Sequence, residues 1–480
     1  MKNLFVVLLI VFSFAAIAQQ PKATVEKGSE KPEREKKDPP VDQISTTQHT
    51  LRVGDETIKY TARTGTIILK DEEGNPRASF FHVAYTKDGA DPATRPVIFT
   101  FNGGPGSSSV WLHMGAFGPK RVVYKDDEGH AATPPYKMVD NEGSLLDVAD
   151  LVFLDPVTTG FSRAIPISDA KKFHNFEADV ETVGEMIRLW TTRNARWSSP
   201  KFLAGESYGT TRAAGLAGWL QDQGLYLNGV MLISSILNFG TARFDSGNDL
   251  PYIVFLPTYT ATAWYHKRLP ADLQSGTLER AAAESEAFAL GEYTTVLMKG
   301  DRATDAERRS VVEKLARYSG LSPRYIESTN LRIGIHRFDK ELLREQHRTV
   351  GRLDSRFIGI DRDAAGEEPD EDPSYAAIYG GYTAVMNDWV RRWLKFETDL
   401  PYEILTGKVR PWGYARHENR YLDVSETLRA AMTQNPDLKV WVANGYYDLA
   451  TPFAATHYTF ARMQIDPTLR KNVTMTHYAG

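Results

Sequence analysis

The chain has 480 residues, of which 42% are hydrophobic and 25% charged, a composition typical of a globular protein with a large core. Its 57 basic and 61 acidic residues give a net charge of −4 and form no long basic block, which argues against a nucleic-acid partner. Cysteine is absent, and this excludes disulfides, thiolate metal sites, a cysteine nucleophile and a lipoprotein anchor.

Residues 1–18 have the features of a secretory signal peptide. Lys2 precedes an apolar run over residues 4–15, and the segment ends in the small-x-small sequence Ala16-Ile17-Ala18. The alternative is a membrane anchor, but the run is shorter than the roughly 20 residues that span a bilayer. We therefore predict a secreted or periplasmic protein with no membrane span after signal removal, since no later stretch is long and apolar enough.

The next segment, residues 19–46, is rich in Lys, Glu, Pro and Gln and has almost no large apolar side chains. It buries too little surface to offset the entropy of ordering it, so we predict a disordered linker. Between His49 and Tyr85 apolar and polar residues alternate, and a turn sequence at residues 73–76 interrupts the pattern. Antiparallel hairpins that lead into the main sheet are expected there.

Short, continuous apolar runs follow, a pattern typical of strands buried on both faces of a parallel sheet. They cover residues 97–101, 151–154, 202–204, 230–233, 440–443 and 473–475. Helix-forming stretches such as 177–193 and 210–220 separate several of them. The alternation predicts an α/β protein with a mostly parallel, doubly wound sheet.

Residues 239–422 differ because they are strongly charged and mostly helix-forming. An acidic, Pro-containing loop at residues 366–373 interrupts the helical pattern. We predict a helical cap inserted into a core that consists of residues 47–238 and 423–480.

A candidate nucleophile lies in the sequence Gly205-Glu206-Ser207-Tyr208-Gly209, after the run 202–204 and before a helix-forming segment. Strand, sharp turn and helix are the setting of a nucleophile elbow, in which the glycines avoid a clash inside the turn. The turn would expose the Ser207 hydroxyl and direct the Tyr208 N–H at a developing oxyanion. The motif alone is weak evidence for a nucleophile, because the same five-residue pattern also occurs by chance in ordinary turns.

Two further motifs follow other predicted strands. Residues 102–109 (NGGPGSSS) come after the run 97–101, where an α/β-hydrolase needs small residues for its second oxyanion donor. A phosphate-binding loop is the alternative, but the spacing fits neither dinucleotide-binding nor Walker sequences. Asp448 follows the run 440–443, where a triad carboxylate belongs, although a solvated loop acid would also fit.

Together these residues resemble the serine carboxypeptidases, a family with the α/β-hydrolase fold, and the chain looks like a bacterial-type, exported member. The likeness rests on residues 102–109, 205–209 and 444–452 (NGYYDLATP), and residues 151–162 (LVFLDPVTTGFS) are similar to a fourth family segment. The chain departs from the family at Ser107, where many members have a cysteine, and at Ala116, where they have a second glutamate. The second departure weakens the prediction of carboxylate binding more than that of serine hydrolysis.

The resemblance implies a role for each motif residue. Ser207 would attack the peptide carbonyl while Asp448 orients a histidine. The oxyanion N–H groups would come from Gly104 and Tyr208. The substrate's C-terminal carboxylate would bind Asn102 and a protonated Glu206, which favours cleavage at acidic pH.

The general base is the missing part. The family's histidine lies in a Gly-His-Met-like segment just after the last strand, whereas this sequence stops at Thr476-His477-Tyr478-Ala479-Gly480. His477 is a weak candidate because it falls inside the strand-like run, and His457 is expected on the helix after Asp448. We interpret the sequence as truncated just before the catalytic histidine; a catalytically weak relative is the alternative.

The expected activity is hydrolysis of C-terminal peptide bonds through an acyl-enzyme, on peptides with a free C-terminus and without a cofactor. A metal site is not expected, since the histidines lack zinc-binding spacing. An esterase or acyltransferase on the same scaffold and a non-catalytic peptide-binding relative remain as alternatives. The sequence predicts neither the preferred side chain at the cleaved bond nor the oligomeric state.

Overall fold

The computed structural model describes residues 39–125 and 132–479. The chain divides into the units Met1–Pro39 and Pro40–Gly480, and everything below concerns the second unit. The predicted signal peptide and most of the predicted linker therefore lie outside the described residues. None of the helices in the described ranges is long and apolar enough to cross a bilayer.

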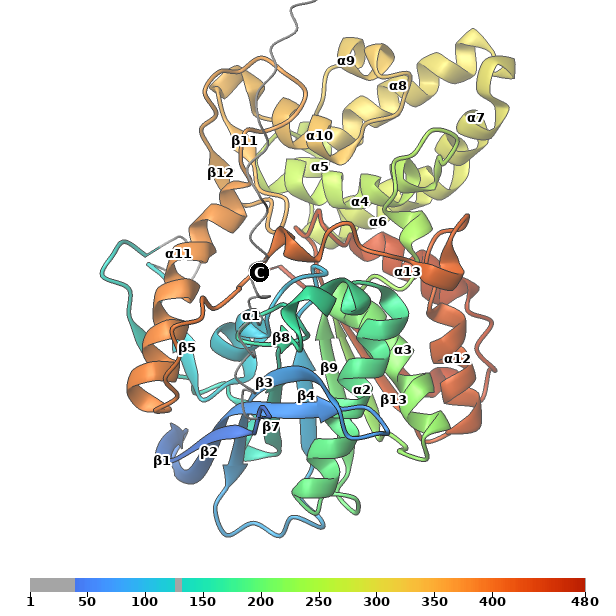
Figure 1. The fold of residues 1–480 in the computed structure, drawn as a ribbon. Coiled ribbons are helices and arrows are strands. Elements are labelled where there is room, and N and C mark those ends of the chain that lie inside the picture. Colours follow the sequence, from blue (N-terminus) through green and yellow to red (C-terminus); the bar gives the residue numbers. More distant parts are fainter. Residues whose placement is uncertain (1–38, 126–131, 480) are drawn as a thin grey trace, which may run out of the picture. The chain divides into compact units, whose positions relative to one another are not determined.

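Within the described residues, ten strands form one central sheet (Figure 1). The order is β1-β2-β3-β7-β4-β9-β10-β13-β14, with β8 (Arg163–Ala164) paired to β3. The pairs from β1 to β7 are antiparallel and those from β7 to β14 are parallel, which confirms the predicted hairpins and the mostly parallel sheet. The strands are β1 Gln43–Val53, β2 Glu56–Lys70, β3 Pro76–Lys87, β4 Val97–Phe101, β7 Asp150–Leu154, β9 Lys201–Glu206, β10 Gly229–Ile233, β13 Lys439–Gly445 and β14 Val473–Tyr478.

The first strand begins inside the range that was predicted as linker. β1 pairs with β2 from Gln43 opposite Thr66 to Val53 opposite Glu56. The ladder satisfies those backbone polar groups of residues 43–46 that face β2, although the side chains are mostly polar and exposed. The linker range 19–46 is therefore corrected to end before Gln43.

Helices cover both faces of the sheet. On one face α2 (Phe176–Arg193), α3 (Tyr208–Asp222) and α12 (Ser425–Gln434) pack in one hydrophobic cluster with the central strands, and α2 and α3 stand in front of the sheet in Figure 1. On the other face α11 (Pro373–Asp388) belongs to one hydrophobic cluster with residues of β1 to β3. This arrangement confirms the predicted doubly wound architecture.

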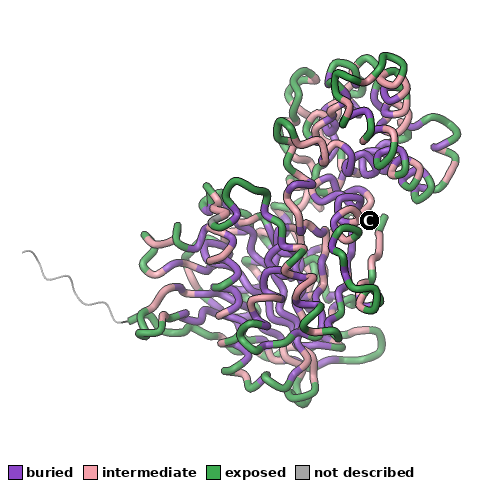
Figure 2. The backbone as a smooth tube through the Cα atoms, turned by 90° about the vertical axis from the view of Figure 1, so that its right-hand side faces the viewer, coloured by how far each residue is buried: buried purple, intermediate pink, exposed green. Residues whose placement is uncertain are grey.

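The cap has a hydrophobic cluster of its own. Tyr259 and Phe338 stack at its centre, with ring centroids 4.0 Å apart. Figure 2 shows buried residues both in the cap and in the sheet region. The sheet's last helix, α13 (Phe453–Arg462), joins the two regions because its Ala455 belongs to the cap cluster. The cap helices are α4 Leu250–Tyr265, α5 Ala271–Gln274, α6 Leu278–Phe288, α7 Thr294–Lys299, α8 Asp305–Ser319, α9 Pro323–Ser328 and α10 Ile335–Glu341.

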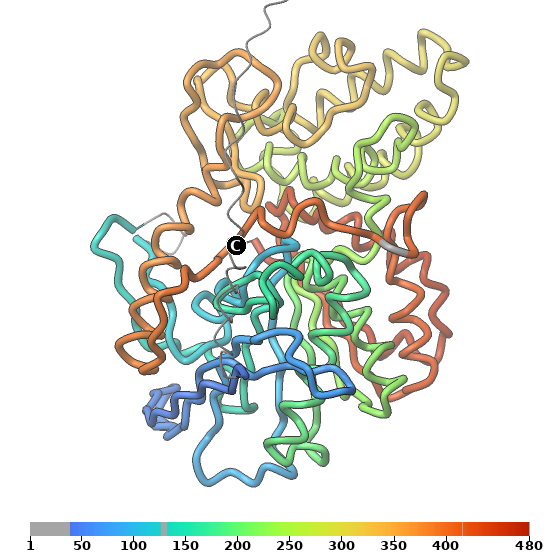
Figure 3. Tube along the Cα trace, in the orientation of Figure 1, coloured from blue at the N-terminus to red at the C-terminus, as the bar shows by residue number. Residues whose placement is uncertain are grey.

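The last part of the predicted insertion, residues 373–422, returns to the sheet domain (Figure 3). The Trp389 indole N–H donates a hydrogen bond to the Tyr85 hydroxyl on β3 at 2.8 Å. Helix propensity and charge do not distinguish a helix of the cap from one that packs on the sheet. The predicted cap range 239–422 is therefore corrected to the segment from α4 to β12 (Ile358–Gly359), which pairs with β11 (Thr349–Val350). Isolated β-bridges attach the returning chain to core loops at Ser107–Leu405, Gly160–Glu403 and Asn175–Gly413.

Candidate active site

Ser207 occupies the sharp turn between β9 and α3, so the predicted strand, turn and helix are present around it. Its φ of 57° and ψ of −129° are strained for a residue with a side chain, at a cost on the order of 1–3 kcal/mol. Main-chain hydrogen bonds hold the turn. The Ser207 N–H donates to the Ile233 carbonyl at 3.0 Å, and the Thr210 N–H donates to the Ser207 carbonyl at 2.8 Å.

Glycines allow the elbow and the loop after β4 to touch. A Cβ on Gly205 would lie 2.2 Å from the Gly209 carbonyl oxygen, and one on Gly209 would lie 2.9 Å from the Phe101 carbonyl oxygen. A Cβ on Gly103 would lie 2.4 Å from the Tyr208 nitrogen. These distances are too short for a side chain, so the close backbone packing around Ser207 requires glycine at all three positions.

Gly104 and Tyr208 line the same cavity as Ser207. Tyr208 is the first residue of α3, so its N–H has no partner within the helix and lies at the positive end of the helix dipole. Gly104 has a φ of 106°, which only glycine adopts without strain. N–H groups from these two residues can stabilise an oxyanion that forms on a carbonyl attacked by Ser207.

Asn102 and Glu206 form a pair directly before the glycine loop and Ser207. The Asn102 amide N–H donates to Glu206 Oε2 at 2.9 Å. Asn102 is fully buried, and its own Oδ1 accepts the Leu112 N–H at 3.1 Å, which fixes the amide orientation. Burial raises the pKa of Glu206 to about 7, and the nearby charge of Asp448 adds to the shift while the bond from Asn102 opposes it. At mildly acidic pH the pair therefore presents two hydrogen-bond donors, which suits a carboxylate ligand.

Asp448 follows β13 in a turn that fixes its carboxylate. Oδ1 accepts the N–H groups of Ala450 and Thr451 at 2.8 and 2.9 Å, and Oδ2 accepts the Thr451 hydroxyl at 2.6 Å. The side chain is 8% exposed, and this burial raises its pKa from the usual value against the opposing hydrogen bonds. A buried, oriented carboxylate at this place can orient an imidazole, as in a catalytic triad.

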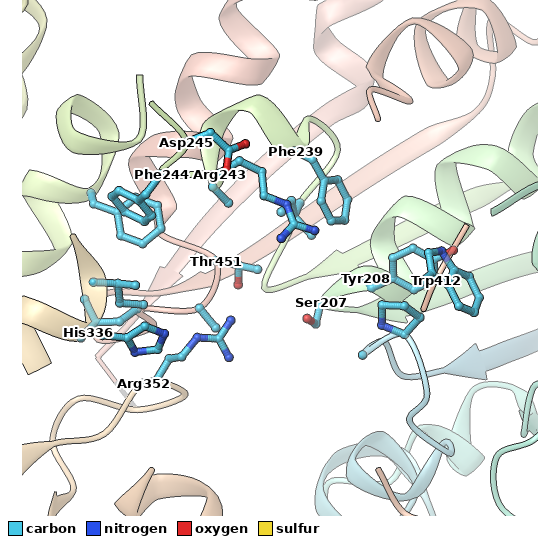
Figure 4. Close-up of a pocket in the computed structure, with 18 of the residues that line it drawn as sticks. Ser207, Tyr208, Phe239, Arg243, Phe244, Asp245, His336, Arg352, Trp412 and Thr451 are labelled. Carbon is cyan, nitrogen blue, oxygen red and sulfur yellow. The ribbon is translucent and has the colours of Figure 1, made fainter. Parts of the chain in front are cut away.

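A cavity of about 1010 Å³ opens in front of Ser207 (Figure 4). The elbow and the glycine loop contribute Ser207, Tyr208 and Gly104. The cap contributes His336 on α10, and Arg352 follows the cap strand β11. The cavity thus lies between the sheet and the cap, and its volume is sufficient for part of a peptide.

The family description "Serine carboxypeptidase" matches residues 55–478, which include every residue of the site described above. The chain belongs to the serine carboxypeptidase family. The fold agrees with this assignment. The crystal structure of a prohormone-processing carboxypeptidase from Saccharomyces cerevisiae aligns over 88% of this chain and 77% of its own, with a TM-score of 0.50 and 15% sequence identity.

Curated relatives of the family are similar over shorter or more diverged stretches. Serine carboxypeptidase-like 19 of Arabidopsis thaliana is 28% identical over 26% of this chain and 26% of its own length. Serine carboxypeptidase-like 22 of the same plant is 22% identical over 86% of this chain and 79% of its own. The first of these alignments therefore spans about a quarter of the relative's length.

The structure does not bring His477 to the site. His477 lies in β14 opposite Asn444, and its Nε2 is 2.8 Å from Nε2 of His457. His457 lies on α13, as expected, and its Nδ1 is 3.0 Å from Glu286 Oε1 in the cap. In residues 39–125 and 132–479, no histidine is hydrogen-bonded to Asp448 or to Ser207.

Sequence reasoning missed a buried ion pair beneath the site. Arg212 Nε donates to Asp179 Oδ2 at 2.8 Å, and both side chains are almost fully buried. Arg212 Nη1 also donates to the Asn102 carbonyl at 2.7 Å, and the Tyr208 hydroxyl donates to Asp179 Oδ2 at 3.1 Å. The pair thus connects α2 and α3 to the elbow and to the loop after β4. The sequence feature that could have indicated this ion pair is the arginine in a helix whose other residues are mostly small or apolar.

The described part of the chain contains no group of three or more His, Asp or Glu side chains arranged to hold a metal ion.

Proposed function

We propose that this chain is a serine carboxypeptidase in activity and hydrolyses the C-terminal peptide bond of peptides through an acyl-enzyme. The pair of Asn102 and Glu206 beside Ser207 carries the proposal. A nucleophilic serine alone would suit any ester or amide, whereas a protonated carboxyl next to an amide donor suits a terminal carboxylate one residue beyond the attacked carbonyl.

In this mechanism Ser207 attacks the carbonyl carbon and its proton passes to a general base. The N–H groups of Gly104 and Tyr208 stabilise the oxyanion, each by about 3 kcal/mol. The base then protonates the leaving amine, the terminal amino acid departs, and water resolves the acyl-enzyme by the reverse sequence. Asp448 orients the base throughout.

The mechanism requires a histidine that the described residues do not supply. The chain order of the fold is serine, acid, histidine, so the base follows Asp448, and the family resemblance assigns it to the segment after the last strand. A protein that cleaves peptides without a histidine in that segment would contradict this assignment. A protein that binds peptides but does not cleave them would favour the non-catalytic, peptide-binding relative.

Substrate comparison on the full-length gene product tests the proposal. We expect cleavage of a blocked dipeptide with a free carboxylate, poor cleavage of the same dipeptide amidated at its C-terminus, and a loss of about 10⁴-fold in kcat for Ser207→Ala. Turnover of the corresponding ester without cleavage of the dipeptide would favour an esterase or acyltransferase. A fluorophosphonate that labels the protein but not Ser207 would contradict the nucleophile assignment.

Export is the second part of the proposal. The positively charged start, the apolar run 4–15 and the small-x-small ending support a secreted or periplasmic protein. N-terminal sequencing of the protein recovered from a periplasmic fraction or culture medium should start near residue 19, and an uncleaved N-terminus in the cytoplasm would contradict it.

A further inference from the structure

The cavity in front of Ser207 lies beside the proposed carboxylate site, because Glu206 directly precedes Ser207 and Asn102 lies two residues before Gly104. Gly104, Ser207 and Tyr208 line it, whereas Asn102 and Glu206 do not. If the terminal carboxylate binds the latter pair, the cavity receives the acyl part of the substrate, on the other side of the attacked carbonyl. The residues that line the cavity would therefore determine which side chain is preferred just before the cleaved bond.

The residues that line this cavity carry more positive than negative charge. Arg243, Arg352 and Arg410 line the cavity together with a single carboxylate, Asp245. Asp245 already accepts a hydrogen bond from the Tyr421 hydroxyl at 3.1 Å. The described lining thus carries two more positive than negative charges, without counting His336.

Among the described residues, none of these three guanidinium groups forms an ion pair, although the charge of Arg352 acts on the buried Asp339. Arg243 Nη2 donates to the Tyr414 hydroxyl at 2.9 Å, and its guanidinium lies 5.6 Å from the Phe239 ring centroid. Arg352 is held through its main chain, where its N–H donates to Asp372 Oδ1 at 3.1 Å and its carbonyl accepts the Leu449 N–H at 3.1 Å. Other arginines of the cap are paired, with Asp272–Arg317, Asp249–Arg332 and Glu367–Arg337 as examples.

Figure 4 shows the side chains of Arg243 and Arg352 extending from two sides into the space near Ser207. A guanidinium that faces a cavity, forms no ion pair and belongs to a lining with excess positive charge favours an anionic group bound there. We propose that this cavity selects acyl groups with a negative charge, so that the preferred residue before the cleaved bond is Glu or Asp. The proposal rests on the function proposed above, and it names the substrate class for that site.

An isosteric substrate pair tests the selection. The full-length protein is given N-blocked Glu-Ala and N-blocked Gln-Ala, which differ only in the charge of the acyl residue. We expect kcat/KM to be roughly tenfold higher for the glutamyl substrate at low ionic strength, and this ratio to fall as salt screens the exposed charges. A ratio of one or below would overturn the proposal.

Matched variants assign the effect to the cavity. Arg352→Gln should reduce the ratio of kcat/KM for the glutamyl substrate to kcat/KM for the glutaminyl substrate about three- to fivefold. Arg324→Gln, at an exposed position of α9 outside the cavity lining, removes the same charge and should leave the ratio unchanged. Equal effects of the two variants would mean that net charge, and not the cavity, sets the preference, which also overturns the proposal.

A binding measurement separates this inference from the proposed activity. Calorimetry with the full-length Ser207→Ala variant compares N-acetylglutamate with N-acetylglutamine. Tighter binding of the glutamate compound supports the anionic cavity even if neither dipeptide is cleaved, an outcome in which only the peptidase proposal fails. Equal binding of the two compounds refutes the anionic cavity whatever the activity.

Discussion

In the proposed function, the protonation state of Glu206 determines how well the substrate's terminal carboxylate binds. With a pKa of about 7 its carboxyl is nearly all protonated at pH 5 and only about one-tenth protonated at pH 8. A deprotonated Glu206 would repel a terminal carboxylate. Binding of peptide acids should therefore weaken as the pH rises, independently of the titration of the catalytic base, which acts mainly on kcat.

Glu206→Gln should remove this pH dependence. Glutamine stays neutral and keeps a donor, so we expect KM for a blocked dipeptide to rise about tenfold between pH 5 and pH 8 in the wild type and to stay nearly constant in the variant. Steady-state kinetics checks this, with a small ester that has no carboxylate as the control substrate. An equal rise of KM in both proteins would show that Glu206 does not bind the carboxylate.

The same titration affects stability. The folded-state pKa of Glu206 is raised above its unfolded value near 4.5, so the folded protein binds the proton more tightly. The contribution is fully present below pH 4.5 and is lost as the pH rises through about 7. We expect Glu206→Gln to gain stability relative to the wild type between pH 4.5 and pH 8 in urea denaturation. A difference that shrinks over this window would contradict the assigned direction of the pKa.

At the scale of elements, the site depends on contact between the loop after β4 and the start of α3. Gly103→Ala would bring a Cβ to about the 2.4 Å separation from the Tyr208 nitrogen described above, so the loop must move away from the elbow. Displacing one oxyanion donor should lower kcat by about 10²- to 10³-fold.

Gly291→Ala is the control for that change, because nothing lies within 4 Å of the added Cβ. It should leave kcat unchanged. Circular dichroism of Gly103→Ala establishes that the protein is folded before the rates are compared. A folded Gly103→Ala variant with wild-type kcat would contradict the role of the loop.

Removing one partner of the ion pair between α2 and α3 should strongly lower the free energy of unfolding. Asp179→Ala leaves the Arg212 guanidinium buried without a counter-charge, and we expect a loss of about 3–5 kcal/mol in the free energy of unfolding. Glu284→Gln, which breaks an exposed pair with Arg280 on α6, should cost less than about 0.5 kcal/mol. Urea denaturation measures both, and similar costs would contradict the importance of burial.

Local patterns in the sequence predicted the sheet strands and the elbow, because a run such as Val97–Phe101 and a turn such as 205–209 are determined by neighbours in the chain. The return of residues 373–422 to the sheet was not predictable in this way. It depends on partners such as Ser107 and Leu405, which are far apart in sequence. Arg212 was missed for a related reason, since a charge on a helix is usually exposed unless a distant segment covers it.

At the scale of the whole molecule, the loops after the sheet strands carry the proposed catalytic residues, and the cap forms one wall of the cavity. Phe338 is fully buried in the cap cluster, so Phe338→Ala should destabilise the cap by about 3–5 kcal/mol. We expect KM for peptides to rise while turnover of a small acetate ester, which needs only the elbow and oxyanion groups, stays near the wild-type value.

Phe99→Ala is the matched control, because Phe99 is equally buried but lies in β4 beneath the site. It should impair turnover of the peptide and of the ester together. If Phe338→Ala lowers turnover of the peptide and of the ester equally, the effect of the cap on peptide binding cannot be separated from the effect of the sheet on catalysis.

The long cap also determines when the site becomes complete. β10 and β13 are neighbours in the sheet, yet the cap and the returning segment come between them in the chain, and Asp448 follows Ser207 by 241 residues. At a synthesis rate of roughly 5–20 residues per second, the elbow leaves the ribosome many seconds before its acid. A chain synthesised only as far as residue 447 has the proposed nucleophile without the proposed acid, so these two groups cannot come together before Asp448 has been made.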